Sequence, residues 1–137
     1  MRIAFGTDER TEVTDAVEAH LEAAGHVVVD PRRDEPWPEV GRAVGEAVAS
    51  GEADAGVVMC WTGTGVSIAA NKVRGIRAAL CTDVATAEGA RRWNDANVLA
   101  MGLRLTTATT AIEMLDAFIG TEVDESERSN IDDVEQA

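Results

Sequence analysis

The sequence predicts an α/β fold in three layers, with a five-stranded parallel sheet and helices on both of its faces. Short apolar runs alternate with amphipathic segments along the chain, and strict alternation of this kind is typical of a parallel sheet. The run at 55–60 is apolar throughout, which indicates a strand buried on both faces. The expected architecture is therefore a Rossmann-like αβα sandwich.

Local patterns place the individual elements. Residues 2–6 form an apolar run that ends at Gly6, and apolar positions from 11 to 24 repeat at helical spacing up to Gly25, a typical helix end. Residues 26–30 are rich in β-branched valine, which predicts a second strand, and the prolines and charges of 31–38 predict a loop. The same reasoning predicts strands at 55–60, 76–81 and 97–101 and helices at 40–50, 66–73, 83–93 and 106–119.

We expect one domain at 1–120, followed by an acidic tail at 121–137. The tail has seven acidic residues and one arginine, and it shows no apolar periodicity. It is interpreted either as a flexible, solvated end or as an arm that packs on a neighbouring subunit.

Charge excludes several classes of partner. The chain has 12 Lys+Arg and 25 Asp+Glu, a net charge of −13, which repels the phosphates of nucleic acids and anionic lipids. Its apolar runs are much shorter than the roughly 20 residues that span a bilayer, and no signal pattern opens it. We therefore expect a cytoplasmic protein with neither nucleic-acid nor membrane partners.

The cysteines and histidines give no support for a metal site or a cofactor. Cys60 and Cys81 lie in apolar, strand-like contexts without a CxxC motif, and His20 and His26 stand apart from them. We expect reduced thiols, no metal and no cofactor. A buried core position is favoured for Cys81.

Ligands of doubly wound sheets bind beyond the carboxyl ends of the strands, and the turn at 60–65, Cys-Trp-Thr-Gly-Thr-Gly, follows the most apolar strand. Its backbone N–H groups and the following helix favour an anion, although glycines also occur in such turns for steric reasons alone. The turn matches neither the P-loop nor GxGxxG, which disfavours a nucleotide. Cys60 is interpreted as a base or nucleophile, or else as a buried core residue. The other segments at this edge are 6–10, 81–83 and 102–104.

Three segments together resemble the ribose-5-phosphate isomerase B / galactose-6-phosphate isomerase (RpiB/LacA/LacB) family. They are 60–72 (CWTGTGVSIAANK), 75–81 (GIRAALC) and 94–99 (NDANVL), and the opening IAFGTD at 3–8 matches as well. The resemblance extends from residue 1 to about 122. It implies a metal-independent aldose–ketose isomerase of sugar phosphates, acting through an enediolate in a homodimer or homotetramer whose active site lies between subunits.

The resemblance also implies roles for individual residues. The catalytic residues would be Cys60, Thr62 and Asp8. Cys60 would move the proton between C1 and C2, Thr62 and the following amides would hold the enediolate oxygen, and Asp8, like Asn94, would bind substrate hydroxyls. Arg104 would face the phosphate, together with Arg128 from another subunit. The substrate-binding positions are Glu9, Trp61, Gly63, Thr64, Gly65, Ser67, Trp93, Asn94, Arg104 and Arg128.

Several substrate-facing positions depart from the family pattern. Glu9 and Trp93 stand where the family has histidines, Trp61 stands where it has glycine, and one tail arginine is missing. Because the family histidine at position 93 opens the sugar ring, its loss predicts a substrate that has no ring to open, such as a tetrose 4-phosphate. In that case the tryptophans would fill the vacated space, whereas aromatic residues at a cleft also serve as plain packing residues.

Two other hypotheses remain. The chain could keep the phosphopentose reaction, with Glu9, Arg10 or water replacing the histidines. Alternatively, it is a non-catalytic sugar-phosphate binder or the partner subunit of a hetero-oligomeric isomerase.

Overall fold

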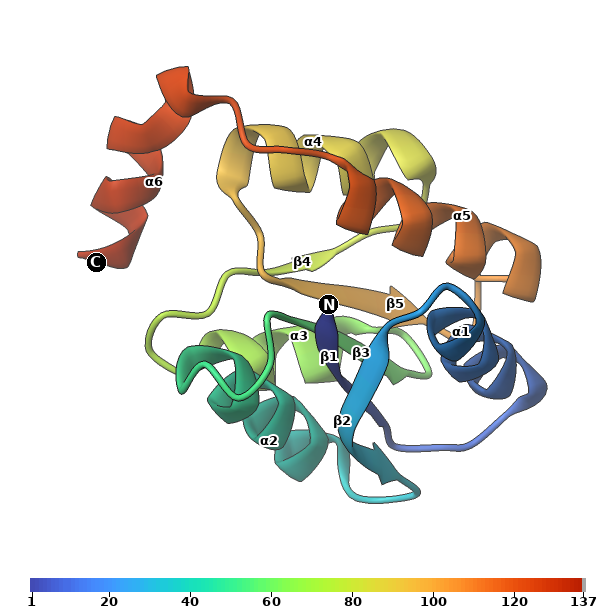
Figure 1. The fold of residues 1–137 in the computed structure, drawn as a ribbon. Coiled ribbons are helices and arrows are strands. Elements are labelled where there is room, and N and C mark those ends of the chain that lie inside the picture. Colours follow the sequence, from blue (N-terminus) through green and yellow to red (C-terminus); the bar gives the residue numbers. More distant parts are fainter. Residues whose placement is uncertain (137) are drawn as a thin grey trace.

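The structure, a computed structural model that describes residues 1–136, confirms the α/β class and the parallel five-stranded sheet (Figure 1). The sheet order is β2-β1-β3-β5-β4, which the sequence did not give. Its strands are β1 (Arg2–Thr7), β2 (Val27–Arg33), β3 (Ala55–Cys60), β4 (Ala78–Leu80) and β5 (Val98–Gly102). The helices are α1 (Glu12–Ala23), α2 (Trp37–Ala49), α3 (Thr64–Asn71), α4 (Val84–Asn94), α5 (Ala108–Gly120), the short 3-10 helix η1 (Glu125–Glu127) and α6 (Arg128–Glu135).

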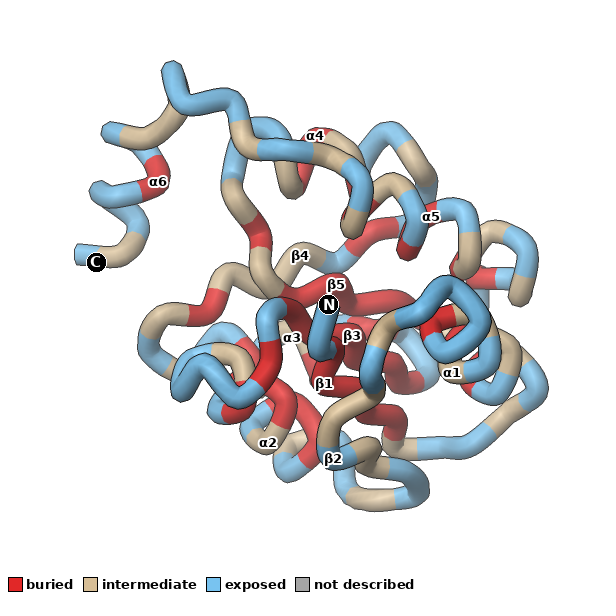
Figure 2. Tube along the Cα trace, viewed as in Figure 1, coloured by how far each residue is buried: buried red, intermediate tan, exposed pale blue. Residues whose placement is uncertain are grey.

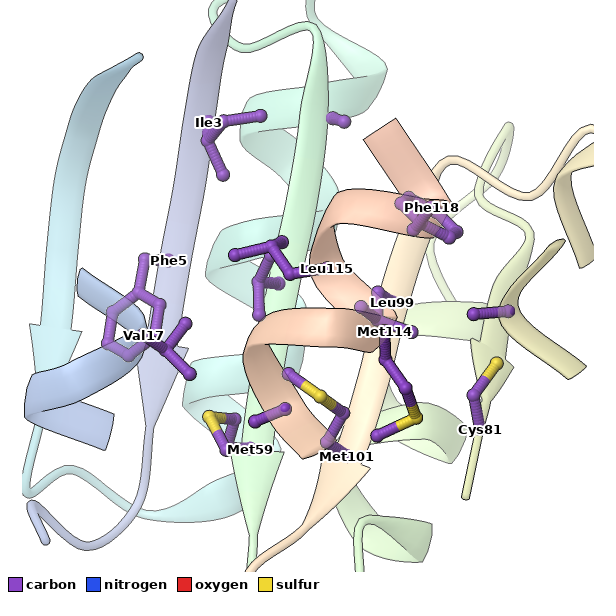
Figure 3. Packing of buried hydrophobic residues seen from close by; sticks show 14 of the residues in the cluster. Ile3, Phe5, Val17, Met59, Cys81, Leu99, Met101, Met114, Leu115 and Phe118 are labelled. Carbon is purple, nitrogen blue, oxygen red and sulfur yellow. The ribbon is translucent and has the colours of Figure 1, made fainter. Parts of the chain in front are cut away.

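Helices cover both faces of the sheet, as expected. Side chains alternate along β3: Val57 and Met59 join the core beneath α1, α4 and α5, whereas Val58 and Cys60 join the core beneath α2 and α3. Figure 2 shows the buried residues concentrated in the central strands, and Figure 3 shows the first of these cores. No helix among residues 1–136 is long and apolar enough to cross a bilayer.

The loop expected at 31–38 is wrong in its first part, because β2 continues through Pro31 to Arg33. The pairing with β1 shifts register between Ala4 and Gly6, where Asp30 adopts a left-handed φ of 44°. Since β2 is an edge strand, Pro31 can lack an N–H without breaking the sheet. The prolines that suggested a loop instead mark a β-bulge and, at Pro38, the first turn of α2.

The acidic tail is partly helical. It contains η1 and α6, and Ile131 is its one buried residue among those described, at 4% exposed. In Figure 1, α6 stands beside the layers rather than within them. Residue 137 of the expected tail lies outside the described residues.

Successive connections diverge at the carboxyl ends of β1 and β3. The chain leaves β1 toward α1 on one face and leaves β3 toward α3 on the other. In parallel sheets, ligands bind where successive connections diverge in this way.

Candidate active site

Asp8 and Cys60 are neighbours at the carboxyl ends of β1 and β3. Thr7 pairs with Met59 in the sheet, and the N–H of Asp8 donates to the Met59 carbonyl at 3.3 Å, so Asp8 is the neighbour of Cys60 one position further along. Cys60 is 5% exposed, at the very end of β3. Two of the three residues expected to be catalytic are thus brought together by strand pairing alone.

The Asp8 carboxylate has one oxygen available to a ligand. Among residues 1–136, its Oδ1 is the one buried side-chain polar atom without a hydrogen-bond partner. Burial, and secondarily the charge of Glu9, raises the pKa of Asp8. The Thr7 hydroxyl fixes the loop by donating to the Glu9 carbonyl at 2.7 Å, while the Glu9 side chain remains exposed. A substrate hydroxyl would satisfy Oδ1.

The glycine turn presents backbone N–H donors at the same edge of the sheet. Gly63 is the N-cap of α3 with φ 77°, and no side chain caps this helix. The Ser67 N–H is bonded within the helix, to the Gly63 carbonyl at 3.2 Å, which leaves the preceding first-turn N–H groups for a ligand. Thr62 and Thr64 share a hydroxyl–hydroxyl hydrogen bond of 2.7 Å and are both exposed. This end of α3 suits an oxyanion.

The loop after β5 is attached to the turn. The N–H groups of Leu103 and Arg104 donate to the carbonyls of Cys60 at 2.9 Å and Trp61 at 2.8 Å. Between these loops lies a pocket of about 170 Å³, with Trp61 at its rim, 59% exposed. It is lined by Trp61, Thr62, Leu80, Thr82, Gly102, Arg104, Leu105 and Thr106.

Sequence reasoning missed Trp37, Leu80 and Leu105. A Cβ on Gly65 would lie 2.9 Å from the Trp37 ring, so this side chain covers the first turn of α3. Leu80 and Leu105 directly adjoin the segments 81–83 and 102–104, which were selected because they follow predicted strands. Extending each segment by one residue would have included them. Nothing in the local pattern marks Trp37, because its contact is made between two helices.

The remaining expected site residues lie elsewhere. Trp93 and Asn94 are the last two residues of α4. This helix of 11 residues, about 16 Å long, runs from the carboxyl end of β4 to the amino end of β5. Trp93 and Asn94 line a separate cavity of about 490 Å³ beside α6. Arg128, the first residue of α6, lies near this cavity and is paired with Asp95 and Glu125. A single chain therefore holds Trp93, Asn94 and Arg128 away from Cys60.

The two thiols are free and occupy different faces of the sheet, so they are not placed to form a disulfide with each other. Cys81 is in the core shown in Figure 3, as favoured from the sequence. Burial, and secondarily the charge of Asp83, raises its pKa to about 11. Within residues 1–136, no three His, Cys, Asp or Glu side chains gather as metal ligands.

Comparison with known proteins identifies relatives along nearly the whole chain. Residues 3–134 match the family model described as Ribose/Galactose Isomerase. Galactose-6-phosphate isomerase subunit LacB of Clostridium acetobutylicum is 41% identical over 87% of this chain and 72% of its own length. D-erythrulose-4-phosphate isomerase of Pectobacterium atrosepticum is 34% identical over 89% of this chain and 84% of its own. The structure of ribose-5-phosphate isomerase B from Clostridium thermocellum superposes with a TM-score of 0.92 at 35% identity, covering 99% of this chain and 96% of that one.

Proposed function

Because the chain belongs to the ribose/galactose isomerase family, we propose that it interconverts an aldose phosphate and the corresponding ketose phosphate, with Cys60 as the base. The observation that carries this proposal is the placement of Cys60 between two groups suited to an enediolate. On one side is Asp8, with its buried, unpartnered Oδ1. On the other is the uncapped N-terminus of α3. Together they can bind a hydroxyl and an oxyanion on either side of a base.

The proton balance of the reaction fits these groups. The Cys60 thiolate removes the proton from C2 of the open-chain aldose, and the negative charge moves to the C1 oxygen, which becomes the enediolate oxygen. Thr62 and the first-turn N–H groups of α3 stabilise the enediolate oxygen. The Cys60 thiol then returns its proton to C1, while the C2 hydroxyl proton passes to the C1 oxygen, which forms the ketose.

We propose that a second copy of the chain completes the site. A two-fold axis across the short edge strand β4 would bring the amino end of β4 in one subunit against the carboxyl end in the other. Exposed apolar side chains occur at both ends of this edge: Trp61, Leu80 and Leu105 at one, and Trp93 and Val134 at the other. Such a pairing would carry Asn94 to the Cys60 site of its partner.

We further propose a short, open-chain substrate, a tetrose 4-phosphate, whose closure into a furanose is blocked by its phosphate. Trp93 cannot exchange a proton as a ring-opening histidine does. The bulky Trp61 at the rim of the small pocket beside Cys60 also favours a shorter carbon chain.

The test follows C–H exchange in D2O by NMR, with four-, five- and six-carbon aldose and ketose phosphates. We expect exchange and isomerisation with the tetrose phosphate, and loss of both in Cys60→Ala. Cys81→Ala is the matched control and should keep its activity. Full-speed turnover of ribose 5-phosphate would overturn the short-substrate proposal. Absence of exchange with every sugar in a folded oligomer would favour a binding protein or a partner subunit instead.

A further inference from the structure

Helix α2 packs against both halves of the proposed active site. Toward the sheet it lies on Gly6, two residues before Asp8, where a Cβ would be 2.6 Å from Val40 Cγ1. Toward α3 it approaches at Gly41, where a Cβ would be 2.8 Å from the Val66 carbonyl oxygen. Glycine permits such approaches because it has no Cβ. α2 therefore contacts both the strand that leads to Asp8 and the helix whose first N–H groups form the proposed oxyanion site.

Trp37, the first residue of α2, lies over Gly65, the second residue of α3. A Cβ on Gly65 would be 2.9 Å from both Cδ2 and Cε3 of the indole and 3.4 Å from Cε2. Such similar distances to three joined ring atoms place Gly65 under the face of the ring rather than at its edge. The contact comes from the side of α3, because a Cβ points away from the helix axis whereas the N–H points along it. The ring therefore leaves the Gly65 N–H open to a ligand.

The backbone around Trp37 is rigid. Pro36 is the N-cap of α2 and Pro38 lies in its first turn, so a proline stands on each side of Trp37. Proline fixes its own φ and restricts the residue before it. The Pro36 carbonyl also accepts from the N–H groups of Glu39 and Val40, both at 3.0 Å. The indole thus extends from a turn whose position is set before any ligand binds.

Electrostatics also favours the contact between Trp37 and α3. The face of an aromatic ring is negative, and the N-terminus of a helix carries partial positive charge. Trp37 is 44% exposed, so more than half of its surface is already covered within a single chain. Lying at the side of the first turn, the ring keeps water from that side. Excluding water there strengthens the interaction of the N–H groups with an oxyanion.

We propose that Trp37 is a positioning residue for the isomerisation: its indole holds Gly65, and with it the first-turn N–H groups of α3, in the direction of the enediolate oxygen. Trp37 acts through Gly65 and does not contact the substrate. The proposal rests on the proposed function, which makes this end of α3 the oxyanion site. Preorganised donors act as charge develops, and a misplacement of about 1 Å can cost roughly 100-fold in rate.

The contact is tested without turnover by NMR of the wild type, Trp37→Phe, Trp37→Ala and the control Glu46→Ala. Glu46 is exposed and lines the same groove between α2 and α3 as Trp37 does. Because a ring face shifts the protons over it to higher field, the Gly65 α-protons should move downfield in Trp37→Ala. Exchange of the Gly65 N–H with water should become at least about threefold faster there, with the hydrogen-bonded Ser67 N–H as reference. Unchanged Gly65 resonances, or equal changes in Glu46→Ala, overturn the proposal.

Turnover separates positioning from plain packing. Trp37→Ala should lower kcat at least about tenfold while KM changes less than about twofold, because the N–H groups act mainly in the transition state. Trp37→Phe keeps an aromatic face over Gly65 and should restore most of kcat, and Glu46→Ala should match the wild type. Rates are compared per folded chain, with the folded fraction measured by circular dichroism. A packing role alone would lower the folded fraction and leave the kcat of the folded enzyme unchanged, which would overturn the proposal.

Gly65→Ala tests the same contact from the other side. The new methyl group would meet the indole, so it should displace the ring and lower kcat. In a Trp37→Ala background the methyl group has room, and adding Gly65→Ala should cost less than about twofold. Full additivity would mean that the methyl group obstructs the ligand itself, which contradicts the positioning role. If no sugar supports C–H exchange, the proposed isomerase function fails, whereas the Gly65 resonances and water exchange still decide whether Trp37 holds the turn.

Discussion

Gly63 and Leu80 are so close that a Cβ on Gly63 would lie 2.6 Å from Leu80 Cδ1. The same Cβ would come within 2.8 and 2.9 Å of the backbone of Met101 and Gly102. Two strands, β4 and β5, therefore converge on one glycine, and this contact sets the height of the proposed oxyanion site above the sheet.

Gly63→Ala should lower the free energy of unfolding by about 2–4 kcal/mol. Alanine is strained at a left-handed φ, and its Cβ would overlap the backbone of Met101 and Gly102. Gly25→Ala is the matched control, since Gly25 has φ 87° but nothing within 4 Å of its Cβ, and it should lose only about 1 kcal/mol. Urea unfolding measures both. Equal losses would mean that the packing against Leu80, Met101 and Gly102 contributes nothing.

Asp8→Asn should stabilise the folded protein at pH 7 while reducing activity. Burial and the charge of Glu9 raise the pKa of Asp8 in the folded state, so the native protein binds this proton more tightly than the unfolded chain does. Stability therefore falls as the pH rises from the unfolded pKa through the folded one. The gain in Tm of Asp8→Asn should shrink as the pH is lowered below about 4, the ordinary value for aspartate. A gain that does not change with pH would contradict this.

Cys81 should resist alkylation in the folded protein. With a pKa of about 11, roughly one thiol in a thousand is ionised at pH 8, and the sulfur lies in the core. Mass spectrometry after iodoacetamide treatment should find Cys81 unmodified until denaturant is added. Rapid native labelling of Cys81 would show that this part of the core opens.

Trp93→His should shift the substrate preference toward sugars that form rings. The imidazole would restore acid–base help in ring opening, so kcat/KM for ribose 5-phosphate relative to a tetrose 4-phosphate should rise at least about tenfold. Trp93→Phe keeps an aromatic ring without proton exchange and should leave the ratio near that of the wild type. An equal shift in both variants would indicate that size, not proton transfer, decides the preference.

Much of the fold follows from local patterns, because alternating apolar runs and amphipathic helices specify a parallel sheet. The exceptions depend on neighbours in space. The sequence pattern predicts a loop at Pro31, but Pro31 lies within β2, where it is tolerated because β2 is an edge strand. The tail lacks apolar periodicity, yet α6 has partners for its charged ends in Asp95 and Arg77.

The candidate site also contains residues that local patterns could select and residues that they could not. Asp8, Cys60 and Arg104 could be selected from the sequence, because residues at the carboxyl ends of parallel strands share one edge. Trp93 and Asn94 were selected by resemblance alone, and the structure places them at the other end of α4. No local signal reports contacts made by a second copy, nor the ion pairs that hold Arg128.

The irregular β2 also bears on aggregation. An open sheet edge is a template for another strand, but here the edge carries a bulge at Asp30, a proline at 31 and a left-handed Asp34. Its flanking side chains include Arg32 and Arg33, each already paired with a carboxylate. An incoming strand would find neither a continuous row of donors nor a flat surface. The backbone of β2 itself therefore protects this edge of the sheet from pairing with another strand.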